Sequence, residues 1–397
     1  MSAASIAAKP WRALHRKLGL ILGLWFALVG ITGSTLVYED EVDAWLNPAL
    51  LHEARIGDRL TPAKILDLAE EQYPRGRVEK IRLPAEAVDV YRVVVRVAPH
   101  LRVESPRVEA MFSAVTGEWL GDRETETLGA QRRYLVRTVY EFHRNVLLGA
   151  FGANVVGIAG FLLMLSAFSG FLSALPHNRA GWKRLVGIKI RAGMTRVLFD
   201  FHRSGGSLLA GLLLLATSTG LTLVYLNYVR DMVGVFSPVA PFPTVPWRAT
   251  PLDAWPSFDS VEAGVRAKYP RQSIAEIHLP SKPTAGFLFY LRGADDVHRL
   301  GDTIVWVHPG SGEILIERGR NNRTNGETIM HWLYPLHSGS AFGSWGKNAM
   351  FLAGLAPLIL VLTGLWVWSR KRRAEIFEEN RRNARGERRR GIGMARQ

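Results

Sequence analysis

The 397-residue chain contains no cysteine. That absence excludes disulfides, thiolate metal sites, iron–sulfur clusters and the C-x-x-C-H attachment of c-type haem. The chain also lacks a P-loop, a G-x-G-x-x-G motif after a strand, an H-E-x-x-H motif and a G-x-S-x-G motif. A redox cofactor would therefore be held without thioether links, and its electrons would come from another protein or a membrane quinol.

Acidic residues are few relative to basic ones: 35 Asp and Glu against 50 Lys and Arg give a net charge of +15. In a soluble protein this excess would indicate nucleic acid or another acidic partner. Here the basic residues cluster beside hydrophobic segments, which is the pattern of the positive-inside rule. We therefore expect a lipid bilayer, and no nucleic acid, as the partner of the basic segments, the arginine-rich tail included.

Four apolar segments are long enough to cross a hydrocarbon core of about 30 Å. They are roughly Leu18–Tyr38, Val146–Leu175, Ser207–Tyr228 and Ala349–Trp368. The first is too long for the apolar region of a signal peptide, and no A-x-A cleavage site follows it. We interpret it as an uncleaved anchor, so the chain is predicted to have four transmembrane helices.

The basic residues of the short flanks predict the orientation of these spans. The N-terminus, the loop His177–Arg196 and the tail from Arg370 are rich in Lys and Arg, which places them and both termini in the cytoplasm. The predicted organisation has spans at 12–38, 143–175, 201–228 and 337–369, outer domains at 39–142 and 229–336, a basic loop at 176–200 and a basic tail at 370–397.

The two halves of the chain repeat the same landmarks. One set recurs after 187 positions: His15 and His202, Thr32 and Thr219, Tyr38 and Tyr225. A second set recurs after 194 positions: His143 and His337, Ser169 and Thr363. Equal offsets at several landmarks indicate an internal duplication of the order helix, outer domain, helix. Both copies start inside, so we expect a parallel repeat about a pseudo-two-fold axis along the membrane normal.

Each outer segment has the pattern of one amphipathic helix followed by a small antiparallel sheet. ILDLAEEQYPRGRVEKIRLP in the first segment matches SVEAGVRAKYPRQSIAEIHLP in the second. Alternating strand patterns follow at Val90–Val97 and Gly286–Gly293, and each segment closes with a strand–turn–strand pattern around Gly117 or Gly312. We expect two outer α+β domains.

Four histidines lie at the ends of the predicted spans and are related by the repeat. An axis along the membrane normal preserves depth, so His15 and His202 lie at one level near the cytoplasmic face, and His143 and His337 at one level near the outer face. Two imidazoles that face each other across a helix bundle can supply both axial ligands of a b-type haem. Noncovalent haem is also the form that a chain without cysteine can hold.

The alternative is that each histidine is only an interfacial polar residue. Both copies of the repeat keep a histidine at the cytoplasmic level and a histidine at the outer level. This retention favours haem iron as the partner of the four histidines. His331 precedes His337 by six positions, so the two do not share a helical face. We interpret His331 as a surface residue, with a substitute ligand or a substrate contact as the alternative, and we interpret His298 and His308 as surface or turn residues.

The motifs LHRKLGLILGLW…TGSTLVYEDEVD, EFHRNVLLG…SGFL, FDFHRSGG…STGLTLVY and LYPLHSGSAFG…TGLWVW resemble those of the PepSY-associated transmembrane proteins, which are iron-regulated inner-membrane proteins of Gram-negative bacteria. The outer segments resemble PepSY domains. Within the family the sequence is most similar to FoxB-type ferric-siderophore reductases. The resemblance covers nearly the whole chain and implies a membrane α-helical fold with four transmembrane helices, arranged as TM–PepSY–TM twice, and two periplasmic α+β domains.

The resemblance further implies an electron conduit with two haem b groups that reduces a ferric siderophore in the periplasm, with a quinol or a cytoplasmic reductase as electron donor. His15 and His202 would hold the haem near the cytoplasm, and His143 and His337 the haem near the periplasm. Three arginines that directly follow histidines would then be candidates to pair with haem propionates: Arg16, Arg144 and Arg203. The competing functions are a PepSY-type binding or regulatory membrane protein and a siderophore transport component, both without redox chemistry.

Overall fold

The computed structural model describes residues 3–53, 55–86, 88–97, 105–176, 179–240, 257–280 and 286–394. The chain forms two compact units, each built from segments that are distant in the sequence. The first comprises Met1–Ser34, Ala150–Leu221 and Ala349–Gln397, and the second comprises Thr35–Gly149 and Thr222–Asn348. We call them the helical unit and the sheet unit.

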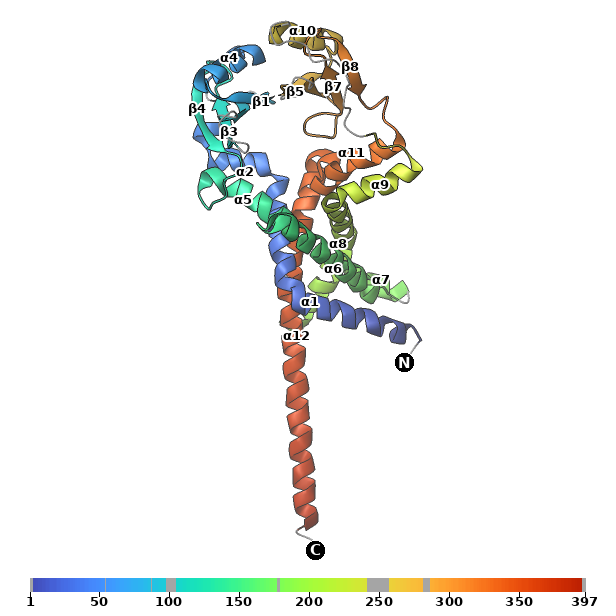
Figure 1. The fold of residues 1–397 in the computed structure, drawn as a ribbon. Helices are drawn as coiled ribbons and strands as arrows, with labels where there is room; N and C mark the ends of the chain where they lie inside the picture. The colour runs from blue at the N-terminus through green and yellow to red at the C-terminus, as the bar shows by residue number, and fades with distance from the viewer. Residues whose placement is uncertain are drawn as a thin grey trace. The chain divides into compact units, whose positions relative to one another are not determined.

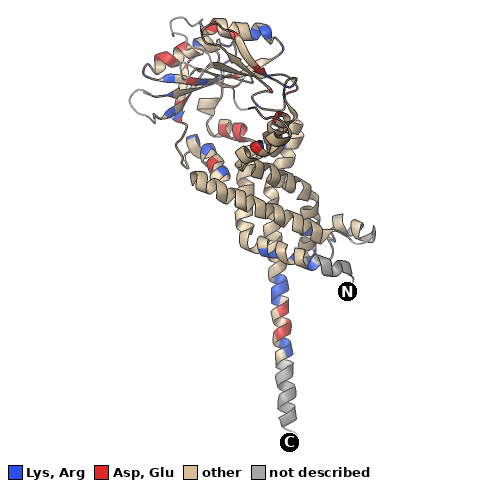
Figure 2. Ribbon diagram, turned by 45° about the vertical axis from the view of Figure 1, so that its right-hand side comes forward, with Lys and Arg blue, Asp and Glu red and all other residues tan. Residues whose placement is uncertain are grey.

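The helical unit is built from long stretches of four helices (Figure 1), which are α1 (Ala3–Val37), α6 (Gly149–Ala174), α8 (Met194–Val224) and α12 (Gly343–Met394). Four stretches are long and apolar enough to cross a membrane: Lys9–Val37, Gly149–Ala174, Met194–Val224, and Ser340–Asn383, which joins η2 (Ser340–Phe342) to α12. Among the described residues, the prediction of four helices that are long and apolar enough to span a membrane is thus confirmed. Helix α7 (Arg179–Val186) precedes α8. Figure 2 shows Lys and Arg on the part of α12 that leads toward the C-terminus.

Small residues allow α1 and α12 to approach closely. A Cβ atom built on Gly30 would overlap the carbonyl oxygen of Gly354, and one built on Gly354 would overlap the hydroxyl of Ser34. The buried Ser34 hydroxyl donates a hydrogen bond to the carbonyl of Phe351 at 2.7 Å. Small residues and interhelical hydrogen bonds of this kind hold helices together where lipid offers no hydrophobic driving force.

The sheet unit contains two series of elements in the same order. Both begin after a long apolar helix and include one helix followed by four strands and a further helix. The first series is α2 (Glu39–Leu46), α3 (Pro48–Leu51), α4 (Pro62–Gln72), β1 (Arg77–Arg82), β2 (Tyr91–Arg96), β3 (Arg107–Phe112), β4 (Trp119–Glu124) and α5 (Arg132–Asn145). The second is α9 (Leu226–Phe236), α10 (Phe258–Lys268), β5 (Ser273–His278), β6 (Phe287–Arg292), β7 (Thr303–Val307), β8 (Ile314–Arg318), α11 (Asn325–Ser338) and η2 (Ser340–Phe342).

These elements confirm the helix and strand patterns predicted for the outer segments, but the described strands form one sheet and not two. The sheet has eight strands in the order β4-β3-β2-β1-β5-β6-β7-β8, and every neighbouring pair is antiparallel. The two series meet where β1 pairs with β5, with Ile81 opposite Ile277. Had each series formed its own sheet, β1 and β5 would be exposed edge strands with unpaired N–H and C=O groups, so their pairing removes two edges.

Apolar residues on alternate strand positions form a core on either side of this seam. In the first series Val93 and Val95 of β2 are fully buried and pack with Ile65 of α4. In the second series Phe289 of β6 is fully buried and packs with Val265 of α10. The period-two pattern of the strands therefore buries one face of the sheet, and the amphipathic helix of each series covers that face.

The tyrosine of each Tyr-Pro pair ties its helix to the last strand of its series. The Tyr73 hydroxyl donates to Asp122 of β4 at 2.6 Å, and the Tyr269 hydroxyl donates to Glu317 of β8 at 2.6 Å. Burial and the neighbouring carboxylate together raise the pKa of each of these tyrosines above its ordinary value of 10.0. Both hydroxyls therefore stay protonated as donors at neutral pH.

Truncation of the seam should destabilise the sheet unit. Ile81 is completely buried at the β1–β5 pairing, so Ile81→Ala leaves a cavity and is expected to cost about 2–5 kcal/mol. The melting temperature of the β-sheet circular dichroism signal should fall by roughly 5 °C or more. Ile56→Ala is the matched control, because Ile56 is fully exposed. Equal melting temperatures for the two variants would show that the seam contributes little stability.

Candidate functional site

His15 of α1 and His202 of α8 face each other in the helical unit. Their ring centroids are 6.0 Å apart, and the ring planes are inclined by 66°. His15 Nδ1 lies 2.9 Å from the carbonyl oxygen of Ser166, and His202 Nδ1 lies 3.1 Å from the hydroxyl oxygen of Thr363. The His202 ring also hydrogen-bonds to the backbone of Leu360. A ring fixed at Nδ1 presents Nε2 as its ligating atom.

A glycine lies against each of these two rings. A Cβ atom on Gly170 of α6 would lie 2.8 Å from His15 Cε1, and one on Gly364 of α12 would lie 3.1 Å from His202 Cε1. Gly170 and Gly364 are 194 positions apart, as are Ser166 and Leu360, whose backbones bond the two rings. The two histidines thus have matching surroundings on two different pairs of helices.

His143 and His337 face each other in the sheet unit. Their ring centroids are 6.3 Å apart, and the ring planes are inclined by 43°. Both residues belong to the last turn of a short helix, α5 or α11, that ends before the next long helix begins. A histidine in the last turn of a helix lies in the negative field of the unpaired carbonyl groups.

The two short helices end in left-handed residues. Val146 and Leu147 adopt positive φ angles of 48° and 63° after α5, and Gly339 adopts a φ angle of 81° after α11. A left-handed conformation is unfavourable for a β-branched residue, so the turn at Val146 needs support from its surroundings. Asn145 supplies it, because its side-chain oxygen accepts the Leu147 N–H at 2.9 Å.

Glu141 is a buried carboxylate close to His143. Its oxygens accept hydrogen bonds from the Asn145 amide at 2.6 Å and from Arg144 at 3.2 Å, and Arg137 lies 2.8 Å away. This group fixes the last turn of α5, on which His143 stands. The Glu-x-His pattern of this turn is not a recognised sequence motif. Only the structure shows that Glu141 is buried.

Both histidine pairs have the spacing of a bis-imidazole metal site. A metal–imidazole bond is about 2 Å long, so two imidazoles on opposite sides of one metal ion have ring centroids roughly 6 Å apart. The observed separations of 6.0 and 6.3 Å match this value. In the part of the chain that the structure describes, no group of three or more His, Cys, Asp or Glu could hold a bare metal ion. Haem iron needs only two ligands from the protein, because the porphyrin supplies four.

The three arginines that follow histidines differ in their surroundings. Arg203 pairs with the buried Asp200 at 3.1 Å, and Arg144 pairs with Glu141 at 3.2 Å. Arg16 is exposed and makes no ion pair with any described residue. Two of the three guanidinium groups are thus already held by a carboxylate of their own helix.

His331 is not a surface residue, and in this respect the prediction was wrong. Its Nε2 lies 2.8 Å from the carboxylate of Asp302, and its side chain is only 15% exposed. Its ring is 5.6 Å from the ring of His298, which is in turn 5.8 Å from the ring of Tyr334. His298 comes from a loop as predicted, but no pattern in the sequence predicts this partly buried group, because it joins a loop to a helix about thirty residues later.

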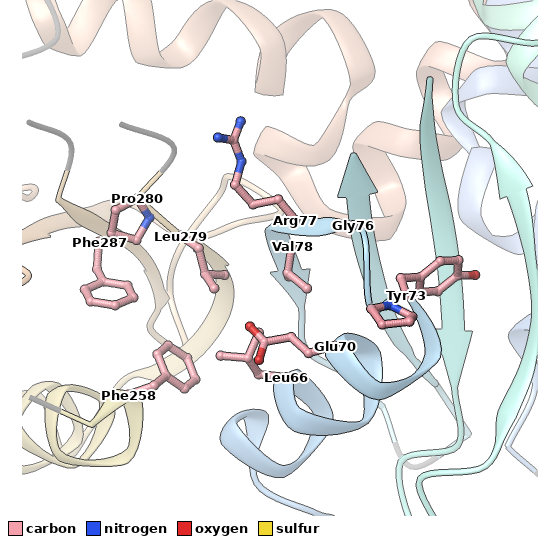
Figure 3. Close-up of a pocket in the computed structure, with 11 residues that line it drawn as sticks. Leu66, Glu70, Tyr73, Gly76, Arg77, Val78, Phe258, Leu279, Pro280 and Phe287 are labelled. Carbon is pink, nitrogen blue, oxygen red and sulfur yellow. The ribbon is translucent and has the colours of Figure 1, made fainter. Parts of the chain in front are cut away.

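Two cavities lie in the sheet unit apart from the histidine pairs. One, of about 430 Å³, lies between α4 and α10, and most of the residues that line it are apolar, with Glu70 and Arg77 as its charged members (Figure 3). Burial and the neighbouring Asp67 raise the pKa of the Glu70 carboxyl. The other, of about 690 Å³, lies at the β1–β5 seam and is rich in arginine. None of the four paired histidines lines either cavity.

A model of the family described as the PepSY-associated TM region matches residues 12–371. The match covers most of the chain and includes all four paired histidines. No curated protein matches the sequence.

The partly buried group around His331 predicts a pH dependence of stability. Burial and the neighbouring His331 lower the pKa of His298 from 6.5 to about 4. Between these values the unfolded chain binds a proton that the folded chain does not, so stability should fall as the pH drops from 6.5 to about 4. Burial alone would raise the pKa of Asp302, but the hydrogen bond from His331 and nearby positive groups lower it from 3.8 to about 2. Its contribution is lost only as the pH falls between these two values.

The melting temperature of the sheet unit, recorded against pH, separates the two windows. His298→Gln should abolish the decline between pH 6.5 and about 4 and leave the loss at lower pH that Asp302 causes. His308→Gln is the control, because His308 lies in the turn between β7 and β8, away from this group. An unchanged decline in His298→Gln would show that other groups titrate in the upper window.

Proposed function

The chain belongs to the PepSY-associated TM region family. On this basis we propose that it is a membrane-bound, haem b-dependent ferric-siderophore reductase. The observation that carries the proposal is the presence of two histidine pairs whose ring centroids are 6.0 and 6.3 Å apart. Each pair joins helices that are far apart in the sequence, and each has the spacing that bis-imidazole ligation of haem iron requires.

His15 and His202 would hold one haem, and His143 and His337 the other. Bound haem supplies one-electron transfer, which no amino-acid side chain of this chain provides without it. The protein orients the ligands: the Ser166 carbonyl and the Thr363 hydroxyl hold the Nδ1 atoms of His15 and His202. Hydrogen bonds to the far nitrogen also tune the basicity of a ligating imidazole, and through it the potential of the iron.

Gly170 and Gly364 keep the space beside the two imidazoles open. At both positions a methyl group would meet the ring within 2.8 to 3.1 Å. Such contacts are shorter than van der Waals distance, so a side chain there would turn the imidazole away from its partner.

The internal repeat accounts for the pairing of the histidines. Tyr73 and Tyr269 differ by 196 positions, and so do Ile81 and Ile277, which pair across the β1–β5 seam. A two-fold axis through the seam would place a residue opposite its own counterpart, which is how Ile81 and Ile277 lie. The parallel hydrogen bonds of the two tyrosines support the same relation.

We propose an orientation with both termini in the cytoplasm of a bacterium and the sheet unit in the periplasm. The N-terminal residues Lys9, Arg12, Arg16 and Lys17 and the run Arg370–Arg373 support it, because Lys and Arg are retained on the cytoplasmic side of the inner membrane. The His15–His202 pair then lies near the cytoplasm and can receive electrons from a quinol or a cytoplasmic reductase. The His143–His337 pair belongs to the sheet unit, on the side of the substrate.

Reduction of iron from the ferric to the ferrous state is a chemically sound route to its release. Siderophores bind through hard oxygen donors, which prefer ferric iron over the softer ferrous ion. A protein that brings electrons to the periplasmic side would therefore free iron without breaking the chelator.

The first test is the absorption spectrum of the detergent-purified protein, oxidised and dithionite-reduced, with haem quantified per chain. Two low-spin b-type haems per chain, reoxidised by a ferric chelate, are expected. A folded protein from haem-replete cells that contains no haem would overturn the proposal and favour a PepSY-type binding or regulatory role.

Alanine substitution of the histidines tests the pairing. His15→Ala and His202→Ala should each remove the same half of the haem content, and His143→Ala and His337→Ala should each remove the other half, because a bis-histidine haem loses an axial ligand in each case. Haem content and the reduced-minus-oxidised spectrum measure the loss. His52→Ala is the control, since His52 is exposed at the end of α3. If His15→Ala and His202→Ala removed different haems, the pairing would be wrong.

Substitution beside the His15 ring tests how the ligand is held. Gly170→Ala places a methyl group 2.8 Å from His15 Cε1, so the midpoint potential or the low-spin signature of that haem should change while the other haem keeps its spectrum. Gly160→Ala on the same helix is the matched control, because its methyl group would meet nothing within 4 Å. A redox titration monitored by absorbance compares the two. Identical titrations would contradict a role for Gly170 in positioning His15.

A further inference from the structure

The larger cavity of the sheet unit lies across the β1–β5 seam and has walls from both series of elements. Its volume of about 690 Å³ falls within the range of small-molecule binding sites. The lining includes six arginines, which are Arg59, Arg82, Arg92, Arg271, Arg292 and Arg299. Only three acidic residues line it: Asp40, Glu86 and Asp89. The surface that faces the cavity is therefore strongly positive.

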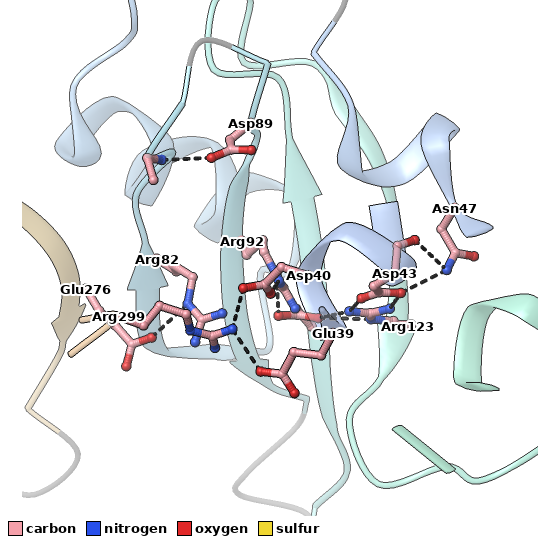
Figure 4. Close-up of polar contacts among 12 residues, drawn as sticks. Glu39, Asp40, Asp43, Asn47, Arg82, Asp89, Arg92, Arg123, Glu276 and Arg299 are labelled. Carbon is pink, nitrogen blue, oxygen red and sulfur yellow. Dashed lines mark hydrogen bonds and ion pairs between the residues drawn. The ribbon is translucent and has the colours of Figure 1, made fainter. Parts of the chain in front are cut away.

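The acidic residues of the lining are largely committed to other partners. Asp89 accepts the backbone N–H groups of Ala85 and Glu86 at 3.0 and 2.7 Å. Asp40 pairs with Arg299 and lies 3.5 Å from Arg92 (Figure 4). These carboxylates therefore leave part of the positive charge of the cavity uncompensated.

Three of the six arginines have no carboxylate partner among the described residues. Arg271 and Arg292 are exposed and make no ion pair there. Arg59 donates only to backbone carbonyls, those of Pro84 at 2.9 Å and of Glu86. These three guanidinium groups are available to an anion that enters the cavity.

The other three arginines of the lining, Arg82, Arg92 and Arg299, lie close to one another. Arg82 lies 3.1 Å from the buried carboxylate of Glu276, and Arg299 lies 2.8 Å from Glu39 (Figure 4). Burial and the neighbouring guanidinium groups of Arg92 and Arg299 lower the pKa of Arg82. Arg92 and Arg299 are held by carboxylates that raise their pKa values, so Arg82 is the member of the three that gains most from an added negative charge.

We propose that this cavity binds a carboxylate-bearing, anionic ferric chelate. The proposal rests on the proposed function and names the charge class of its substrate. Guanidinium groups present paired N–H donors that match the two oxygens of a carboxylate, and several of them around one cavity fit a chelate with more than one carboxylate.

The cavity adjoins the helix that carries one of the paired histidines. Arg299 and Leu300 line it, and the Leu300 N–H donates to Nδ1 of the adjacent His298 at 3.3 Å. The His298 ring lies 5.8 Å from the ring of Tyr334, which precedes His337 by one helical turn on α11. A chelate bound by these arginines is thus held on the wall that packs against the His337 helix.

Binding of gallium(III) citrate to the detergent-purified full-length protein, measured by titration calorimetry, tests the proposal. Gallium(III) keeps the charge and oxygen coordination of the ferric chelate and is not reduced, so the measurement reports binding alone. Arg271→Glu and Arg292→Glu should each weaken binding by roughly tenfold, because each reverses a charge at the cavity without breaking an ion pair. The wild-type affinity should also fall as the salt concentration rises.

Arg75→Glu is the matched control. Arg75 stands 196 positions before Arg271, after the same Tyr-Pro pair, and it is exposed but does not line the cavity. It should bind gallium citrate as the wild type does. No binding by the wild type, wild-type affinity in both cavity variants, or an equal loss in Arg75→Glu would each overturn the proposal.

The calorimetric result is independent of haem, so the two proposals fail in different ways. A protein that lacks haem but binds gallium citrate through Arg271 and Arg292 would overturn the reductase and leave the anion site. A protein with two haems that reduces ferric chelates, but shows no effect of the two arginine variants, would keep the reductase and overturn the anion site.

Discussion

The antiparallel pairing of β1 with β5 is the contact on which the sheet unit depends. Through Ile81 and Ile277 it joins two stretches of chain that are 196 positions apart. It removes an exposed edge from each half of the sheet, and it brings together the two walls of the arginine-rich cavity. The helices that follow the last strands, α5 and α11, carry the histidines that meet at 6.3 Å. A single strand pair thus underlies both the cavity and the framework of one histidine pair.

The helical unit relies on close approach of helices and not on a sheet. Gly30 and Gly354 allow α1 and α12 to pack closely. Gly170 and Gly364 leave room for the imidazoles of His15 and His202. Histidine in an apolar setting is stabilised only when its polar nitrogens have partners. The backbone of Ser166 and the Thr363 hydroxyl are such partners, and they bond the ring atom that a metal would not use. Packing and hydrogen bonding therefore hold these two rings in place, facing each other.

Much of this architecture could be read from the sequence, and for identifiable reasons. The four apolar helices follow from length and hydropathy, since the bilayer imposes both. The strands of the sheet follow from the alternation in segments such as Tyr91–Arg96 and Phe287–Arg292. Equal offsets between histidines led to the expectation that His15 would meet His202 and His143 would meet His337, and both pairs are close in space. Repetition can be counted along a chain without knowledge of its fold.

The number of apolar helices, the local elements and the correspondence between histidines could all be inferred without the fold, because each of these is a property of pattern and spacing. Three further features became apparent only in the folded molecule: the two series of strands share one sheet, His331 contacts Asp302, and Arg271 and Arg292 line one cavity with Arg82. These facts depend on contacts between segments far apart in the chain. Local pattern carries no information about which edge strand finds which partner, or which charges the pairing then brings together.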